Sequence, residues 1–249
     1  MAIDKNSFFK YQEHRAQSGY RTAILVRESG DTVTDTTNKY SLLIASETVP
    51  AIFGTPETFD FDLLNSPVKG KVEGKSDLEA TDVECLLHRD NIYRLFKLKD
   101  KVLDFLYLTP DFVGYKFSGT ITFRPNEAGA DVLRGTYTIT PMSADPNPIF
   151  DCRDMIEETL CFEDAIPERI KSTDTINLSL VQKDVTAKYT IVKINKDGTT
   201  ATGGTDSVTA TAPEQSTVSV ATTGLYAITA TATGYAPWTT TVYIDTSTN

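Results

Sequence analysis

The chain has 249 residues, which is enough for one large or two ordinary domains with hydrophobic cores. Its hydrophobic share of 40% and charged share of 23% are typical of a globular protein, and no uninterrupted apolar run is long enough to cross a membrane. The formal net charge of −10 comes without any block of basic residues. This disfavours tight binding of DNA or RNA, because proteins that grip nucleic acid concentrate Lys and Arg against its phosphates.

The N-terminus and the cysteines both indicate a reducing compartment. The first residues, MAIDKNSFFKYQEHR, mix charged and aromatic side chains where a secretory signal needs an apolar stretch, so we expect synthesis and assembly in the cytoplasm. Cys85, Cys152 and Cys161 are an odd set without CxxC spacing, which favours reduced thiols over a disulfide framework or a zinc site. A bridge between Cys152 and Cys161 is the sterically conceivable alternative.

The first two thirds of the chain predict strands and one helix. Strand candidates are TAILVRE at 22–28, YSLLIAS at 40–46, ETFDFDLL at 57–64, DLEATDVECLL at 77–87 and VLDFLYL at 102–108. The helix is predicted in RDNIYRLFKLK, where Ile92, Leu95 and Phe96 have i, i+3, i+4 spacing. Asp90 at its start and Lys97 near its end suit the helix dipole.

The clearest local pattern is a hairpin from Lys116 to Pro141. Apolar residues and glycines alternate with polar ones along both of its strands, and Pro125, Asn126 and Gly129 supply turn chemistry between them. We therefore expect one face to cover a core and the other to present hydroxyls to water. The candidate residues of the polar face are Thr120, Thr122, Arg124, Arg134, Thr136 and Thr138.

The composition changes after Lys171, where Thr becomes the dominant residue and helix signals disappear. Short alternating runs follow, separated by Gly-containing turns; they are TINLSLV, KYTIVKI, DSVTATA, STVSVAT, LYAITATA and TTTVYI. We predict two domains, a first one at 1–172 and a small β-sandwich at 173–249. The run 142–170 is harder to assign, as a short helix packed on the sheet or as an arm that reaches a neighbour.

The aromatic residues of the C-terminal part favour a core role. Trp238, Tyr226, Tyr235 and Tyr243 are expected to be core and corner residues of the sandwich. The stretch GLYAITATATGYAPWTTTVYI resembles bacterial immunoglobulin-like modules and the related carboxypeptidase-regulatory-like sandwiches, which commonly decorate cell-surface and virion proteins.

Two stretches resemble catalytic or metal-binding motifs without matching them, and the two histidines suggest no metal site. GKVEGKS, at 70–76, has three residues between its first Gly and Gly-Lys-Ser where a phosphate-binding loop needs four, and no helix is predicted after it. His14 and His88 do not have metal-ligand spacing. The sequence NKDG, at 195–198, begins like a calcium loop but lacks the later ligands, so we interpret it as a hairpin turn. We expect no catalytic residue, no cofactor and no metal.

The order of the elements in the first domain resembles the major tail tube proteins of long-tailed bacteriophages. The similarity covers roughly 41–141 and consists of ETVPAIFGTPETFDFDLL, VKGKVEGKSDLEATDVECLL, the helix, VLDFLYLTPD and the hairpin, in that order. It implies a mainly β fold, with a β-barrel-like sandwich flanked by one α-helix and followed here by a small immunoglobulin-like β-sandwich. It also implies a structural virion protein rather than an enzyme.

The resemblance further implies partners and a location. Family members close into hexameric rings that stack into a tail tube, which conducts DNA during infection, and several carry a C-terminal immunoglobulin-like domain that projects outward. The expected partners are copies of the same chain and other tail proteins, namely the tape measure, the terminator and the distal tail protein. Viral DNA would be non-specific cargo in the lumen, lined by the polar face of the hairpin. The expected location is the virion tail, with no membrane partner.

Two hypotheses accompany this expectation. Because the composition changes near Lys171, residues 174–249 are expected to be dispensable for assembly. The alternative function, from another class, is a β-modular surface adhesion or carbohydrate-binding protein. It draws on Tyr226, Tyr235 and Trp238, and the missing export signal counts against it.

Overall fold

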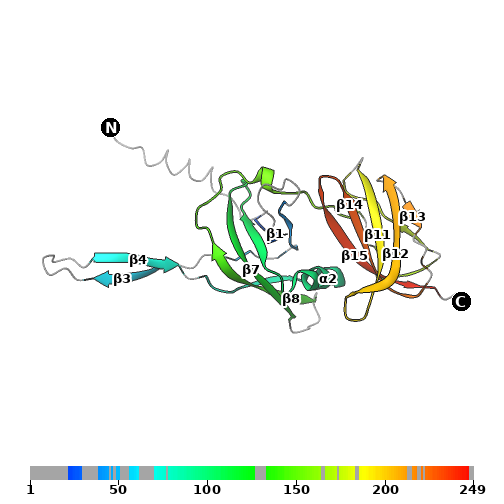
Figure 1. The fold of residues 1–249 in the computed structure, drawn as a ribbon, viewed down its shortest axis with the longest axis horizontal. Coiled ribbons are helices and arrows are strands. Elements are labelled where there is room, and N and C mark those ends of the chain that lie inside the picture. Colours follow the sequence, from blue (N-terminus) through cyan, green and yellow to red (C-terminus); the bar gives the residue numbers. More distant parts are fainter. Residues whose placement is uncertain are drawn as a thin grey trace.

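The computed structural model contains two β-bodies with a helix between them (Figure 1). The predicted mainly β fold with one flanking helix is confirmed. The residues that the structure describes are 22–29, 39–44, 46, 49–50, 56–61, 70–76, 78–126, 133–163, 166–172, 174–182, 185–211, 215–217, 220 and 222–246.

The N-terminal body is built on a six-stranded antiparallel sheet. Its strand order is β2-β1-β6-β7-β8-β5. The strands are β1 (Ala23–Glu28), β2 (Ser41–Leu42), β5 (Thr81–Leu86), β6 (Leu103–Leu108), β7 (Gly114–Pro125) and β8 (Arg134–Ala144). The long β7–β8 ribbon is the predicted hairpin, and its return strand continues past the predicted end to Ala144. A shift of register between Ser118 and Gly119 accommodates the extra length.

The two edges of this sheet are joined by the short segment that follows β2. β2 pairs with β1 at one edge, and Ser46 forms an isolated bridge with Cys85 of β5 at the other. Leu43 and Ile44 are buried between these points, and the Ser46 hydroxyl lies 2.9 Å from that of Tyr137. The body is therefore barrel-like. Its interior holds Ile24, Val26, Leu43, Ile44, Val83, Cys85, Leu95, Leu103, Phe105, Phe117, Ile121, Tyr137 and Ile139.

Helix α2 (Arg89–Leu98) lies at one end of the barrel. Leu95 enters the barrel core, and the Asn91 side-chain amide donates to the Leu86 carbonyl at 2.8 Å. Of the predicted apolar stripe, only Leu95 is buried, whereas Ile92 and Phe96 are 36% and 38% exposed. The reason is geometric, because the helix meets the barrel along one line and its Ile92–Phe96 side faces the C-terminal body across a hollow.

Residues 145–157 form a strap over the outer face of β1 and β6. Gly114 and Ile149 exchange two backbone hydrogen bonds, and Tyr40 and Ile156 form a parallel bridge. The only helical turn described in the strap is a 3-10 turn at Arg153–Met155. Beneath the strap lies a small second core of Leu25, Tyr40, Leu106, Leu108 and Cys152. The strap therefore closes one half of the outer face of the sheet.

The C-terminal body contains a five-stranded sheet and a short two-stranded one. The strand orders are β12-β11-β14-β15-β9 and β10-β13. The strands are β9 (Arg169–Lys171), β10 (Thr175–Asn177), β11 (Thr186–Ile194), β12 (Thr200–Thr211), β13 (Gln215–Thr217), β14 (Gly224–Ala232) and β15 (Tyr235–Asp245). Leu178, Leu180 and Val220, which flank the short sheet, share one core with the side chains of the larger sheet.

The C-terminal body begins upstream of the predicted division at 172/173. β9 adds to the sheet parallel to β15, and Thr159 forms a bridge with Ala236. Leu160 and Ile170 are buried in the C-terminal core. The fold of this body therefore starts near residue 158, because apolar residues before the Thr-rich region complete its core. The change in composition marks a change of residue types and not the folding boundary.

The predicted core and corner roles are found for Tyr226, Tyr235 and Trp238, whereas Tyr243 is half-buried outside the core with the Arg169 guanidinium 5.4 Å from its ring centroid. Tyr226 is 3% exposed, and its hydroxyl donates to the Thr222 carbonyl at 2.6 Å, four residues upstream. This is the arrangement of a tyrosine corner. Tyr235 and Trp238 are partly buried and pack against the core.

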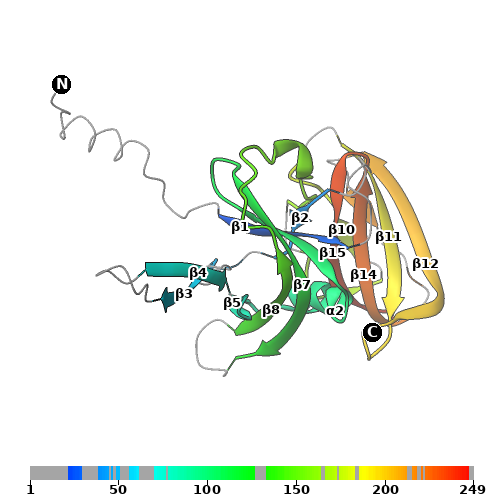
Figure 2. The same cartoon turned by 60° about the vertical axis from the view of Figure 1, so that its left-hand side comes forward.

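A two-stranded hairpin projects from the N-terminal body. It consists of β3 (Pro56–Phe61) and β4 (Gly70–Ser76), which pair antiparallel with each other and with no other described strand. Figures 1 and 2 show it extending away from both bodies, on the side opposite the C-terminal body. The hairpin thus leaves two strand edges unpaired within the described chain.

Candidate assembly surface

The uncovered half of the outer face of the sheet carries the polar residues predicted from the hairpin. Thr120 lies opposite Thr140, and Thr122 lies opposite Thr138. Strand β5 extends the polar rows, because Asp82 pairs with Thr138 in the register of the sheet. We call this surface, formed by the polar positions of β5, β7 and β8, the open face. Its threonines are cross-strand neighbours, which is a favourable pairing in a sheet.

The charges on the open face are largely matched. The Asp82 carboxylate accepts a hydrogen bond from the Thr138 hydroxyl at 2.6 Å and forms a salt bridge with Arg124 at 3.1 Å. Both charged side chains are more than half exposed, so this pair contributes little stability. Its main consequence is that Arg124 is not an isolated cation. Besides hydroxyls and this neutralised pair, the polar positions of the three strands include Glu84, Lys116 and Arg134.

The structure brings the six predicted polar residues onto two adjacent strands and separates one of them from solvent. Thr122 and Arg124 are exposed, and Thr120, Arg134 and Thr138 are half-buried. Thr136 is only 6% exposed, and its hydroxyl donates to the Asn126 side-chain oxygen at 2.6 Å. Thr136 therefore stabilises the turn end of the hairpin instead of facing water.

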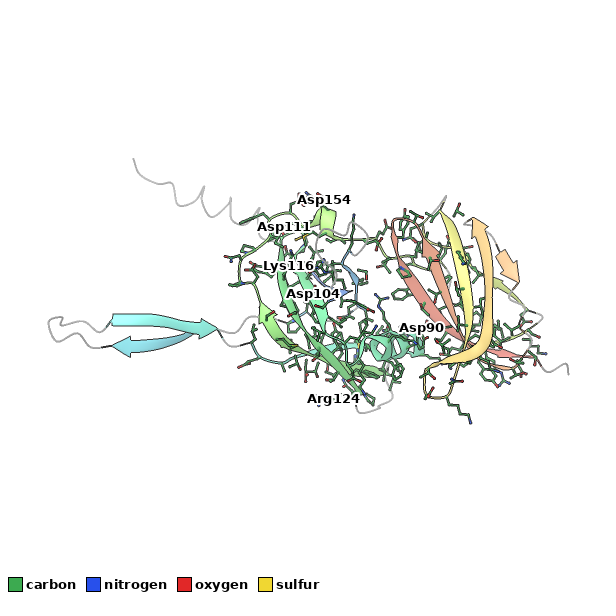
Figure 3. The ribbon with its side chains drawn as sticks, viewed as in Figure 1. Asp90, Asp104, Asp111, Lys116, Arg124 and Asp154 are labelled. Carbon is green, nitrogen blue, oxygen red and sulfur yellow. The ribbon has the colours of Figure 1, made fainter. Side chains whose placement is uncertain are left out.

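An ion pair lies at the limit between the open face and the strap. Arg27 and Asp104 are cross-strand partners on β1 and β6, and their side chains are 3.2 Å apart. The Arg27 guanidinium also lies over the Tyr40 ring, 4.6 Å from its centroid. Figure 3 places Arg124 at one end of the sheet and Asp111 and Asp154 at the other. The open face and the strap thus occupy opposite ends of the same surface.

Asp90 joins the two bodies at the start of α2 (Figure 3). Its carboxylate accepts hydrogen bonds from the Thr240 hydroxyl at 2.8 Å, the Thr241 amide at 2.7 Å and the Thr241 hydroxyl at 2.6 Å. Thr240 and Thr241 belong to β15 and are buried. A carboxylate that satisfies three donors is a strong local contact. The C-terminal body is therefore docked on the helix as well as tethered by the chain.

The sequence stretches that resembled catalytic or metal motifs have ordinary structural roles. The run from Gly70 to Ser76 is strand β4, which rules out a loop that wraps a phosphate. The predicted turn after β11 is confirmed, since Gly198 has φ 81° and Asp197 accepts a hydrogen bond from the Thr199 amide at 3.0 Å. His88 directly precedes α2, and His14 lies outside the described residues.

The thiols and possible metal ligands do not form a site in the described part of the chain. Cys85, Cys152 and Cys161 are all free, and the first two are buried. No group of three or more His, Cys, Asp or Glu side chains among the described residues has the arrangement of a metal site. No described helix is both long and apolar enough to cross a bilayer.

Comparison with known proteins does not assign the chain to a family. No protein-family model matches it, and no curated protein is similar to it. Any inference about function therefore depends on the residues and geometry described above.

The aromatic trio of the alternative function does not form an open platform. Tyr226 is buried, and Trp238 packs on the C-terminal core with the Arg94 guanidinium 5.3 Å from its ring centroid. Sugar rings stack on exposed aromatic faces, whereas the rings of Tyr226 and Trp238 both make contacts within the chain. The geometry thus gives no observation in favour of carbohydrate binding.

Proposed function

We propose that the protein is a structural subunit of a bacteriophage tail tube, polymerising as stacked hexameric rings that conduct DNA. The element order in the sequence motivates the proposal. A barrel-like body with one flanking helix and a projecting hairpin agrees with it. The observation that carries the proposal is the β3–β4 hairpin.

The hairpin is built for contact with another chain. A two-stranded hairpin alone is at best marginally stable in water, and its outer edges leave amides and carbonyls unpaired. β3 and β4 pair only with each other in the described chain and point away from both bodies. A contact of this hairpin with a different surface of the next copy would be heterologous. Repeated contacts of that kind produce closed rings or open-ended tubes.

The open face suits the wall of a conduit. Threonine hydroxyls hydrate the surface, and Arg124 is held by Asp82. A wall of this composition cannot neutralise many phosphates, so DNA would gain little from binding and would pass. We assign this role to Thr120, Thr122 and Thr138, with the buried Thr136 stabilising the turn behind them.

The C-terminal body is proposed to lie outside the tube. It lies on the opposite side of the barrel from the hairpin, away from that contact surface. A truncation that tests its dispensability has to end near residue 158, because ending near Lys171 would leave β9 without its partner β15. We expect the shortened chain to assemble. Loss of assembly in a folded truncated chain would contradict this part of the proposal.

The test of the main proposal is direct imaging of assembly. Concentrated protein is examined by size-exclusion chromatography and electron microscopy, with a variant in which residues 56–76 are replaced by a short Gly-Ser linker. Rings or tubes are expected for the native chain and a folded monomer for the variant. A native chain that stays monomeric at every concentration, alone and with partner tail proteins, would sink the proposal.

The conduit role has its own test. Thr120, Thr122 and Thr138 are replaced together by Lys, and the matched control places three Lys residues at exposed positions outside the open face, Thr200, Thr223 and Thr231. We expect the first variant to form tubes through which DNA passes more slowly, because added cations bind phosphates. Unchanged passage in assembled particles would remove the open face from the wall.

A further inference from the structure

A cavity of about 400 Å³ lies between the barrel, helix α2 and the C-terminal body. Charged side chains from all three elements or their flanking segments line it. They are Arg27, Glu28, Lys39, Arg94, Lys97 and Glu157.

Arg94 is the least compensated of these charges. Its Nη2 donates to the Leu42 carbonyl, while its Nε is buried and makes no hydrogen bond. Among the described residues it has no carboxylate partner, and its remaining contact is with the ring of Trp238. Burial lowers the pKa of the Arg94 guanidinium to about 10, because desolvation disfavours its charged form. A half-buried cation whose Nε is shielded from water and that lacks a counter-charge is costly, so its retention needs an explanation.

The other charges of the cavity leave an excess of positive charge. Arg27 is paired with Asp104 at 3.2 Å, and Glu28 is paired with Lys101 at 2.6 Å. The remaining charges that line the cavity are three cations, Lys39, Arg94 and Lys97, and one carboxylate, Glu157. None of these four side chains forms an ion pair with a described residue. The Lys97 ammonium has only a contact with the Tyr93 ring, at 5.2 Å. The cavity therefore carries two more cations than anions in a chain whose net charge is −10.

We propose that this cavity is an anion-binding site for a phosphate or carboxylate group, held by Arg94 with Lys39 and Lys97. The planar guanidinium pairs with both groups through parallel N–H···O bonds, and the ammonium groups add flexible point charges. The anion supplies the counter-charge that Arg94 lacks. The proposal concerns a single chain and holds whether or not the chain forms a tube.

The simpler explanation is that Arg94 only connects the two bodies. Its contacts with Leu42 on one side and Trp238 on the other would serve that purpose without a ligand. The two explanations differ in what Arg94→Met does. If Arg94 is a connector alone, the variant is destabilised and the protein ignores added anions. If it is an anion site, the variant is at least as stable as the native chain in buffer without phosphate or carboxylate, because a half-buried charge without a carboxylate partner is removed.

The two explanations are distinguished by thermal unfolding and by calorimetric titration with inorganic phosphate. Both measurements are made in chloride buffer at constant ionic strength. For the native protein we expect saturable binding and a rise in Tm of about 3 °C at phosphate tenfold above its Kd. Arg94→Met should abolish both, and Lys97→Met, which leaves the Arg94 contacts in place, should weaken binding severalfold. The matched control is Arg124→Met on the open face, which should respond to phosphate like the native chain.

A second arm identifies where the anion comes from. Without added phosphate, a Tm that rises with protein concentration in the native chain but not in Arg94→Met would assign the anion to a carboxylate of a second copy. Saturable phosphate binding with a Tm independent of protein concentration would assign it to a dissolved ligand. The proposal is overturned if neither response occurs, or if Arg94→Met and Lys97→Met respond to phosphate as the native chain does.

Discussion

The barrel and the C-terminal body are both antiparallel β-structures, but their cores are completed in different ways. The barrel is closed by the segment that follows β2, because Ser46 forms an isolated β-bridge with Cys85 of β5. The C-terminal body instead requires residues from before the Thr-rich region, including Leu160 and Ile170. It is also bound to α2 through Asp90. Similar strand patterns can thus form one body that is self-contained and another that depends on its neighbour.

Of the substitutions that test this comparison, Leu160→Ala should lower the stability most. Leu160 is completely buried in the C-terminal core, so its truncation should cost about 2–5 kcal/mol of that body's stability. The single tryptophan, Trp238, lies in the same body, and its fluorescence follows unfolding there in urea. Leu133→Ala is the control, because Leu133 is 46% exposed, and should change stability by less than about 0.5 kcal/mol. Equal midpoints for both variants would mean that the segment before the Thr-rich region does not complete the C-terminal core.

Asp90→Ala should separate the two bodies. It leaves the buried Thr241 amide and two threonine hydroxyls without their acceptor, at a cost of about 2–3 kcal/mol. Differential scanning calorimetry is expected to show the C-terminal body unfolding at a lower temperature than the barrel. The exposed Asp154 provides the matched control, Asp154→Ala, which should leave the trace unchanged. A single transition at the native temperature in Asp90→Ala would show that the bodies are coupled by other contacts.

Alkaline pH should lower the stability of the N-terminal body through Tyr40, which lies in the small core beneath the strap. Burial raises the pKa of Tyr40 to about 12, above its ordinary value of about 10. Its contribution to stability is therefore complete below pH 10 and is lost as pH rises toward 12, since the unfolded chain gives up the proton first. Tyr40→Phe should reduce the loss of stability between pH 8 and pH 11 by about 1.4 kcal/mol, measured by urea unfolding at both values.

The same measurement contains its own control at pH 8. The Tyr40 hydroxyl makes no hydrogen bond with a described residue, so the native and Tyr40→Phe proteins should have similar stability there. If the two proteins lose stability in parallel between pH 8 and pH 11, the proton of Tyr40 is not protected by folding.

The smallest expected effect is that of Tyr226→Phe in the C-terminal body. The variant loses the hydrogen bond to the Thr222 carbonyl, which contributes about 1 kcal/mol. Tyr235→Phe is the matched control, because the Tyr235 hydroxyl makes no hydrogen bond with a described residue. Tryptophan-detected urea unfolding of both variants measures the difference. A loss of the same size in both would argue against a stabilising corner.

Local patterns in the sequence predicted much of this fold and its open face. Alternation placed Phe117, Ile121 and Ile139 in the barrel core and Thr122 and Arg124 at the surface, as the structure has them. The helix was predicted from spacing and dipole, and the turn at 195–198 from its Asp-Gly pair. These features depend on neighbours within a few residues, so the sequence contains the information that decides them.

The tertiary structure decided what depends on distant partners. Thr136 matches its neighbours in the polar pattern, yet it is buried because it bonds to Asn126 across the turn. Ile92 and Phe96 have core spacing but stay partly exposed, because they lie on the side of α2 that faces the hollow toward the C-terminal body. The contacts of Asp90 with β15 and the cavity around Arg94 join residues about 150 positions apart. Local propensity carries no information at that range, so only packing of the two bodies could reveal them.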